Sequence, residues 1–125
     1  MSNILLIEPD HVLASNLRLA LERAGHQLSW AVDAQTAISQ ADADTPSLVI
    51  SDLFLAGRSG IEFLYEFRSY PEWQQVPVIL LSSLPEGEVN LQSSGFLQLG
   101  IAKYFYKPQA TLAQIVGAAQ LALAG

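Results

Sequence analysis

The stretch Leu48-Val49-Ile50-Ser51-Asp52 decides the fold, because it is a short apolar run that ends in a carboxylate. A continuous apolar run of this length predicts a strand that is covered on both faces, as strands of parallel sheets are. The surrounding sequence predicts four further strands, at Ile4–Ile7, Gln27–Val32, Val76–Leu81 and Lys103–Tyr106. The segments between these strands determine how the strands are connected.

Helical patterns lie between the strands and after the last one. Asp10, Asp33 and Thr111 each precede apolar residues at helical spacing, so each is predicted to cap the start of a helix. The first of these helices is expected to stop at Gly25, and the second at about Ala43. Strands that alternate with helices through short connections predict a parallel sheet with helices on both faces.

The two remaining helices carry mixed signals. Ser59-Gly60-Ile61-Glu62 has the spacing of a capping box and predicts a helix start, with Ile61, Leu64 and Tyr65 on its buried face. The predicted helix Glu86–Leu99 is the weakest, because its glycines and serines lower helix propensity. The order is therefore strand then helix, five times, in an α/β fold with a single doubly wound five-stranded parallel sheet.

Length and composition limit the function. The chain has 125 residues, which predicts one domain over 1–125, and half of them are hydrophobic. The net charge of −6 argues against binding nucleic acid or an anionic membrane, both of which need clustered cations. Cysteine is absent, which excludes disulfide scaffolds and thiolate metal sites. We expect a cytoplasmic protein, because neither a signal peptide nor a membrane-spanning run is visible.

Polar side chains stand where the predicted strands end. Glu8 and Asp10 follow the first strand, Asp52 ends the third, Ser82 follows the fourth, and Lys107 follows the fifth. Taken singly, each has an ordinary structural role, such as capping a helix or starting a turn. Because the carboxyl ends of parallel strands share one edge, we expect all of them to lie around one mouth.

These stretches resemble the response-regulator receiver domains of two-component signalling, the CheY-like family, over nearly the whole chain. The resemblance is carried by five stretches in the right order: residues 4–10, 46–53, 57–64, 76–83 and 103–108. It implies a flavodoxin-like fold with strand order 2-1-3-4-5. It also implies a phosphorelay role, in which a sensor histidine kinase or a phosphotransfer protein phosphorylates an aspartate. The protein would assist its own phosphorylation and dephosphorylation without being a conventional enzyme.

The resemblance assigns roles by position. Asp52 matches the phospho-acceptor, and Glu8, Asp52 and the backbone carbonyl of Phe54 match ligands of Mg²⁺. Ser82 and Lys107 match the residues that bind the phosphoryl group, and Ser82 and Tyr104 match a switch pair. Phe54 and Leu84 match positions that govern dephosphorylation; both are bulky, which predicts slow hydrolysis. Pro108 matches a proline that often follows a cis bond.

One residue departs from the family pattern at the metal site. Pro9 stands where an acid is usual, and proline has no side-chain oxygen. Three arrangements stay open: Asp10 serves instead, Glu8 and Asp52 bind Mg²⁺ with an extra water, or the metal binds poorly. Ala56 also replaces a proline that is common in this loop, which predicts a looser loop.

Three functions follow from these observations. The favoured one is a receiver that signals to a downstream protein through the face of the fourth helix, fifth strand and last helix, with a homodimer through that face left open. The chain ends shortly after the last helix, which suggests a stand-alone receiver, with an excised domain as the alternative. The second is a pseudo-receiver that binds partners without being phosphorylated, because of Pro9. A flavin carrier or a small phosphatase is disfavoured, because Glu8-Pro9-Asp10-His11 is acidic and repels phosphate.

Overall fold

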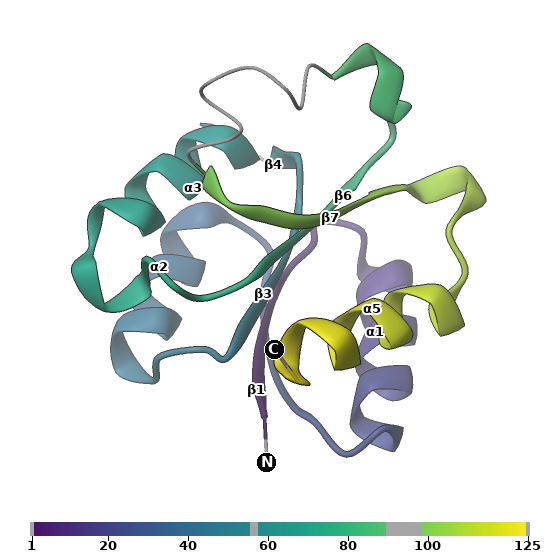
Figure 1. Ribbon diagram of the computed structural model, residues 1–125, viewed down its shortest axis with the longest axis horizontal. Coiled ribbons are helices and arrows are strands. Elements are labelled where there is room, and N and C mark those ends of the chain that lie inside the picture. Colours follow the sequence, from purple (N-terminus) through teal and green to yellow (C-terminus); the bar gives the residue numbers. More distant parts are fainter. Residues whose placement is uncertain (1, 56–57, 90–98, 125) are drawn as a thin grey trace.

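A computed structural model describes residues 2–55, 58–89 and 99–124 (Figure 1). Five strands form one parallel sheet: β1 (Asn3–Ile7), β2 (Gln27–Ala31), β3 (Leu48–Asp52), β6 (Val78–Ser82) and β7 (Ile101–Tyr106). Their order is β2-β1-β3-β6-β7. Counted along the chain within this sheet, that is the predicted order 2-1-3-4-5, so the α/β fold is confirmed.

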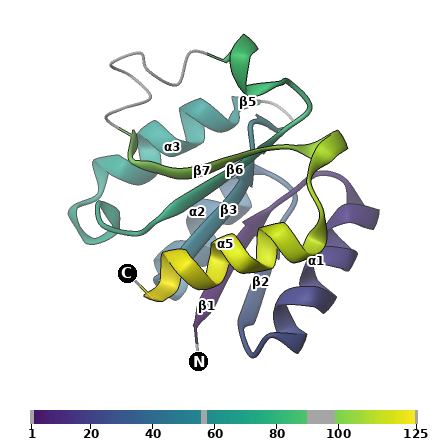
Figure 2. The ribbon, with the colours of Figure 1, turned by 45° about the vertical axis from the view of Figure 1, so that its right-hand side comes forward.

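Helices cover both faces of the sheet. On one face lie α2 (Ala34–Ala43) and α3 (Gly60–Ser69), and on the other lie α1 (His11–Arg23) and α5 (Leu112–Ala124) (Figure 1). Figure 2 shows α5 running along its face of the sheet beside α1. Among the described residues, no helix is long and apolar enough to span a membrane.

The core consists of two apolar layers, one on each side of the sheet. Side chains alternate along a strand, so β1 sends Leu5 and Ile7 toward α2 and α3, and Ile4 and Leu6 toward α1 and α5. All five residues of β3 are buried, and so are all five of β6. The continuous apolar runs in the sequence are explained by this burial on both faces.

The helix caps predicted at Asp10, Asp33 and Thr111 are present. Asp10 Oδ1 accepts hydrogen bonds from the backbone N–H groups of Val12 and Leu13, at 2.9 and 3.2 Å. Asp33 Oδ1 accepts one from Thr36 N–H at 2.8 Å. Thr111 and Gln114 each accept from the other's backbone N–H, at 3.1 and 2.9 Å, which is a capping box. After α1, Gly25 takes φ +96°, a conformation that side chains disfavour, and the helix ends there.

The described residues correct two predictions about helices. Tyr65 is exposed, and α3 instead buries Phe63, Leu64 and Phe67, so its apolar face is rotated from the predicted one. A helix running on from Glu86 is also wrong: a 3₁₀ turn, η2 (Glu86–Glu88), is followed by extended backbone at Val89. The rest of that predicted helix lies outside the described residues, apart from its last residue, Leu99.

Short elements account for the other differences. The 3₁₀ turn η1 (Pro71–Trp73) follows α3 and begins with a proline. The turn η3 (Lys107–Gln109) follows β7, and the described chain contains no cis peptide bond, so the bond before Pro108 is trans. Trans is the more stable isomer even before proline, and nothing in this turn requires the other.

The loop after Asp52 contains an unpredicted hairpin. β4 (Phe54–Leu55) pairs antiparallel with β5 (Arg58–Ser59). The two residues between them, including Ala56, lie outside the described residues, so the prediction of a looser loop is not tested there. The pairing fixes both flanks of this loop directly above the carboxyl end of β3.

Candidate functional site

The strand ends bring Glu8, Asp52 and Lys107 together at the carboxyl edge of the sheet. β1 lies between β2 and β3, so the strand order reverses at β1, where open α/β sheets bind their ligands. The side chains of Glu8 and Asp52 are buried, and 23% of the Lys107 side chain is exposed. The site is therefore a partly covered opening at the edge of the sheet, with two buried carboxylates and one partly exposed ammonium group.

Lys107 bridges the two carboxylates. Its Nζ lies 2.9 Å from Glu8 Oε1 and donates a hydrogen bond to Glu8 Oε2 at 3.1 Å. It also donates to Asp52 Oδ2 in a close ion pair. Lys107 directly follows β7 and begins η3, so the end of the edge strand places the ammonium group over the ends of β1 and β3.

The electrostatics of the cluster follow from burial and pairing. Burial raises the pKa of Glu8, against the lowering effect of its hydrogen bonds from Asp10 N–H and Lys107. Burial alone would lower the pKa of Lys107, but its hydrogen bonds to Asp52 and Glu8 outweigh that effect and raise it. Lys107 is therefore held in its charged form. When both carboxylates are ionised, the two of them against one ammonium group leave one negative charge to attract a further cation.

The Asp10 side chain caps a helix and does not join this cluster. Its side chain is exposed and accepts the two backbone N–H groups that cap α1. The Asp10 N–H donates a hydrogen bond to Glu8 Oε2 at 3.0 Å, which helps to orient the Glu8 carboxylate. Within residues 2–55, 58–89 and 99–124, no three His, Cys, Asp or Glu side chains are grouped so as to hold a metal ion.

Asp52 is oriented by the backbone that follows it. Phe54 N–H donates to Asp52 Oδ1 at 2.7 Å, which leaves Oδ2 for Lys107. The Phe54 side chain is 49% exposed at the rim of the mouth. The two oxygens of Asp52 thus have different partners, one from the chain's own loop and one from the lysine across the site.

Ser82 and Tyr104 meet at the backbone of Leu84. Leu84 N–H donates to Ser82 Oγ at 3.0 Å, and the Tyr104 hydroxyl donates to Leu84 C=O at 2.6 Å. Ser82 is fully buried and Tyr104 nearly so. Burial raises the pKa of Tyr104, partly offset by a hydrogen bond with the Ser82 side chain. The chain's own contacts therefore hold the Tyr104 ring inside.

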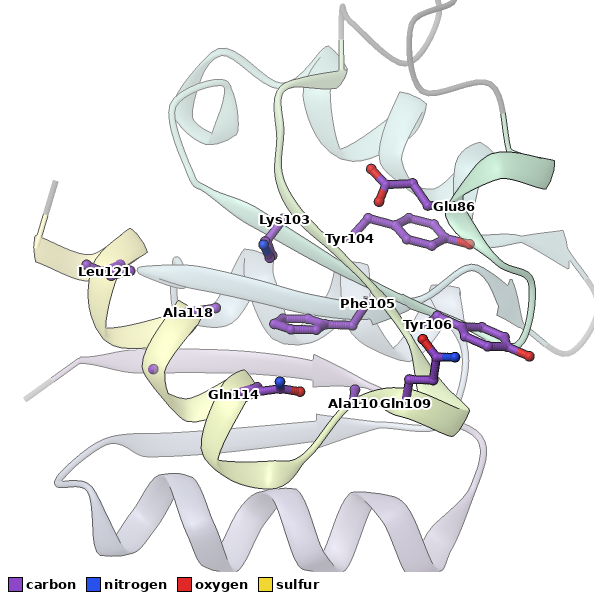
Figure 3. Close-up of a pocket in the computed structure, with 11 residues that line it drawn as sticks. Glu86, Lys103, Tyr104, Phe105, Tyr106, Gln109, Ala110, Gln114, Ala118 and Leu121 are labelled. Atoms are coloured by element: carbon purple, nitrogen blue, oxygen red, sulfur yellow. The ribbon is translucent and has the colours of Figure 1, made fainter.

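A groove runs along the exposed edge of β7 beside α5 (Figure 3). It has a volume of about 560 Å³ and is lined by aromatic residues of β7 and one side of α5, with Glu86 at its rim. No residue of α5 is charged, and Leu121 is 78% exposed. Surfaces that bind other proteins are often enriched in aromatic residues at their centre, and this groove fits that description in its aromatic residues, with the charged Lys103 and Glu86 also in its lining.

Several contacts at the site could not be read from the sequence. The Ser51 hydroxyl donates to the Asp52 backbone C=O at 3.0 Å, and Gly60 packs against the same carbonyl. The Trp30 indole N–H donates to Glu8 C=O at 2.9 Å. A serine inside an apolar strand was a usable signal for the first contact, because a buried hydroxyl needs a partner. The other two depend on tertiary packing.

Known proteins resemble this chain in sequence and in fold. Residues 4–119 match the sequence pattern of the family described as Response regulator receiver domain. The KDP operon transcriptional regulatory protein KdpE of Escherichia coli is 34% identical over 108 residues, which are 86% of this chain and 45% of that protein. The phosphate regulon transcriptional regulatory protein PhoB of the same species is 29% identical over 84% of this chain and 44% of its own length. The chain thus spans less than half of these relatives.

Solved structures share the fold over almost the full chain. A putative response regulator from Chloroflexus aurantiacus superposes with a TM-score of 0.85 at 23% identity, over 99% of this chain and 98% of that one. The chemotaxis response regulator CheY4 of Vibrio cholerae superposes with a TM-score of 0.86 at 19% identity, over 98% of both chains. At these identities the likeness concerns the fold.

Proposed function

This chain belongs to the response regulator receiver domain family, and we propose that it is a phosphorelay receiver that accepts a phosphoryl group on Asp52. The observation that carries the proposal is the contact of Asp52 with Lys107 at the strand-order reversal. The donor is a phosphohistidine of a sensor histidine kinase or a phosphotransfer protein, as membership of the family implies. DNA binding is named for the longer relatives and forms no part of this proposal.

Transfer to Asp52 is a displacement at phosphorus. A carboxylate oxygen of Asp52 forms the new bond to phosphorus, and the bond from phosphorus to the donor nitrogen breaks, with its electron pair going to the imidazole. Both reactants carry negative charge, so positioning and charge stabilisation dominate catalysis. Lys107 supplies a cation at the acceptor oxygen, and Phe54 N–H fixes the other oxygen of the same carboxylate.

The residues present fit Mg²⁺, although sparsely. Glu8 Oε1 is buried and accepts no hydrogen bond, and its close partner is the Lys107 ammonium group, 2.9 Å away. Glu8, Asp52 and the backbone carbonyl of Phe54 would hold the ion, which commonly takes one or two carboxylates and keeps several waters. The ion would supply charge neutralisation at the phosphoryl oxygens. Pro9 contributes no side-chain oxygen and Asp10 caps α1, so we expect weak affinity.

A second candidate is favoured by the same observation about the metal. With Pro9 in place of an acid and Lys107 already neutralising part of the cluster, the chain could serve as a pseudo-receiver that binds partners and is never phosphorylated. In this candidate the fold and the groove beside β7 are unchanged, and Asp52 serves only in its ion pair with Lys107. The two candidates differ in one measurable property, which is whether Asp52 takes up a phosphoryl group.

The proposed output runs from Ser82 to the groove. A phosphoryl group on Asp52 would offer acceptors to the Ser82 hydroxyl, and Ser82 is joined through Leu84 to Tyr104 at the groove wall. A change at Ser82 would therefore alter the face of β7 and α5, where we place a downstream protein partner or a second copy. Phe54 and Leu84 are bulky residues near Asp52 and Ser82, and we expect slow hydrolysis of the phosphoryl group.

Two experiments test these proposals. Acetyl phosphate with Mg²⁺ should add one phosphoryl group, seen as intact mass, and Asp52→Asn should gain none. Uptake by the variant would place the acceptor elsewhere, and no uptake by either protein would favour the pseudo-receiver. The decay of the phosphorylated protein then tests the roles of Phe54 and Leu84, because a half-life of seconds would contradict slow hydrolysis.

A further inference from the structure

Ser51 is a buried polar residue that the proposed reaction leaves unused. It is fully buried in β3, between Ile50 and Asp52. A hydroxyl inside an apolar layer costs free energy unless it has a hydrogen-bond partner. Its partner is the backbone carbonyl of Asp52, at 3.0 Å. The serine therefore contacts the residue of interest through the backbone and not through the carboxylate.

Gly60 also lies against the same carbonyl. A Cβ atom built on Gly60 would lie 2.4 Å from the Asp52 oxygen and 2.9 Å from the Leu53 oxygen, closer than side-chain carbons come to carbonyls. Gly60 N–H also donates to Leu53 C=O at 2.7 Å. The first residue of α3 thus packs directly on the backbone of the acceptor, and only glycine fits there.

These contacts continue to the carboxylate. Leu53 N–H donates to Leu81 C=O at 2.8 Å, so the peptide after Asp52 is tied to β6 as well as to α3. With that peptide fixed, Phe54 N–H is aimed at Asp52 Oδ1. The orientation of the carboxylate therefore depends on the backbone from Asp52 to Phe54.

We propose that Ser51 and Gly60 are positioning residues that set the direction of the Asp52 carboxylate by holding its backbone carbonyl. The value of this hold for function rests on the proposed phosphoryl transfer to Asp52. Displacement reactions are sensitive to the placement of the nucleophile, and a misplacement of about 1 Å can cost about a hundredfold in rate. The hold itself is a property of the folded chain and can be measured without the reaction.

A matched pair of variants isolates the Ser51 hydroxyl. Ser51→Thr keeps a hydroxyl and Ser51→Val does not, while both add the same volume and suit a strand. The first readout is the amide proton shift of Phe54 by NMR, which reports its hydrogen bond to Asp52. We expect Ser51→Thr to keep the wild-type shift and Ser51→Val to move it upfield. The second readout is the rate of phosphoryl uptake from acetyl phosphate, which Ser51→Val should lower about tenfold.

A second pair tests Gly60 and covers a failure of the first pair to fold. Gly60→Ala should move the Phe54 amide and slow uptake by about a hundredfold, whereas Gly87→Ala should change neither. Gly87 is a fair control because an added Cβ there meets no atom within 4 Å. Ser51→Ala, which adds no volume, replaces Ser51→Val if that variant is unfolded by circular dichroism.

The outcomes separate this inference from the proposed function. Equal Phe54 shifts in the threonine and valine variants would overturn the positioning role of Ser51, whatever the wild-type protein does with acetyl phosphate. A wild-type protein that takes up no phosphoryl group would overturn the proposed function, and the Phe54 shift would still decide the inference. Unchanged shift and rate in Gly60→Ala would overturn the role of Gly60.

Discussion

The two central strands beside the site both bring a serine to their carboxyl ends, and the two serines are used in opposite ways. In β3, the Ser51 hydroxyl donates to a backbone carbonyl and is fully occupied inside the strand. In β6, Ser82 Oγ accepts from Leu84 N–H, and its side chain also meets Tyr104. The end of β3 is therefore a fixed support for Asp52, whereas the end of β6 connects the site to the groove. In the proposed function, the end of β3 holds the Asp52 carboxylate in place and the end of β6 transmits its phosphorylation state.

The largest effect is expected from removing the Lys107 ammonium group, which pairs with Asp52 at the end of β3. Lys107→Met should leave the buried carboxylates of Glu8 and Asp52 unpaired and lower the free energy of unfolding by about 2 kcal/mol or more, measured by urea denaturation. It should also abolish phosphoryl uptake. Lys103→Met is the control, because Lys103 has no ion pair within the described residues and should change stability by less than about 0.5 kcal/mol. Equal effects of the two changes would refute the role of the bridge.

Placing an acid at position 9 tests whether the missing carboxylate is the cause of weak Mg²⁺ binding. Pro9→Asp should tighten Mg²⁺ binding about tenfold, because a third carboxylate would be added to Glu8 and Asp52. Trp30 is the reporter, since its indole N–H donates to Glu8 C=O and its fluorescence should respond to the ion. Pro9→Ala controls for loss of the ring. If the alanine variant gains as much affinity, the missing oxygen is not the cause of weak binding.

The connection between Ser82 and Tyr104 can be tested through their hydrogen bonds to the Leu84 backbone. Ser82→Ala and Tyr104→Phe each remove one hydrogen bond to its backbone and should each cost about 1 kcal/mol. Because the two bonds share one peptide segment, the double variant should depart from additivity by about 0.5 kcal/mol or more. A strictly additive pair in chemical denaturation would mean that Ser82 and Tyr104 are not linked.

The smallest expected effect is an alkaline one at Tyr104. Burial raises the pKa of Tyr104 above its ordinary value near 10, so the neutral hydroxyl is favoured by folding. The corresponding stability is complete below the unfolded pKa and is lost as the pH rises through the folded pKa. Wild-type protein should therefore lose more stability than Tyr104→Phe in that range. Parallel loss in both proteins would show that folding does not raise the pKa of Tyr104.

The fold was predictable where local patterns decided it. Apolar runs marked the five strands, and Asp10, Asp33 and Thr111 marked helix starts, because capping depends on neighbours in sequence. The hairpin of Phe54–Leu55 with Arg58–Ser59 was missed, since it depends on pairing across a loop. Tyr65 was placed inside because periodicity gives a stripe, whereas the docking of α3 decides which side of the helix is buried.

The meeting of three strand-end residues at one edge was predictable, and the geometry of their contacts was not. Glu8, Asp52 and Lys107 were expected together because parallel strands end at a common edge. That Lys107 bridges both carboxylates depends on three-dimensional distances. Asp10 had two predicted uses, as a helix cap and as a metal ligand, and only the structure shows its oxygen turned to the α1 backbone. The contact of Gly60 with Asp52 joins two elements that no local pattern relates.

Intact-mass measurement after incubation with acetyl phosphate and Mg²⁺ tests the central claim most directly, with Asp52→Asn and Lys107→Met alongside. The account predicts one added phosphoryl group on the wild-type chain and none on either variant. An unchanged wild-type mass, or an equal gain by Asp52→Asn, would contradict it.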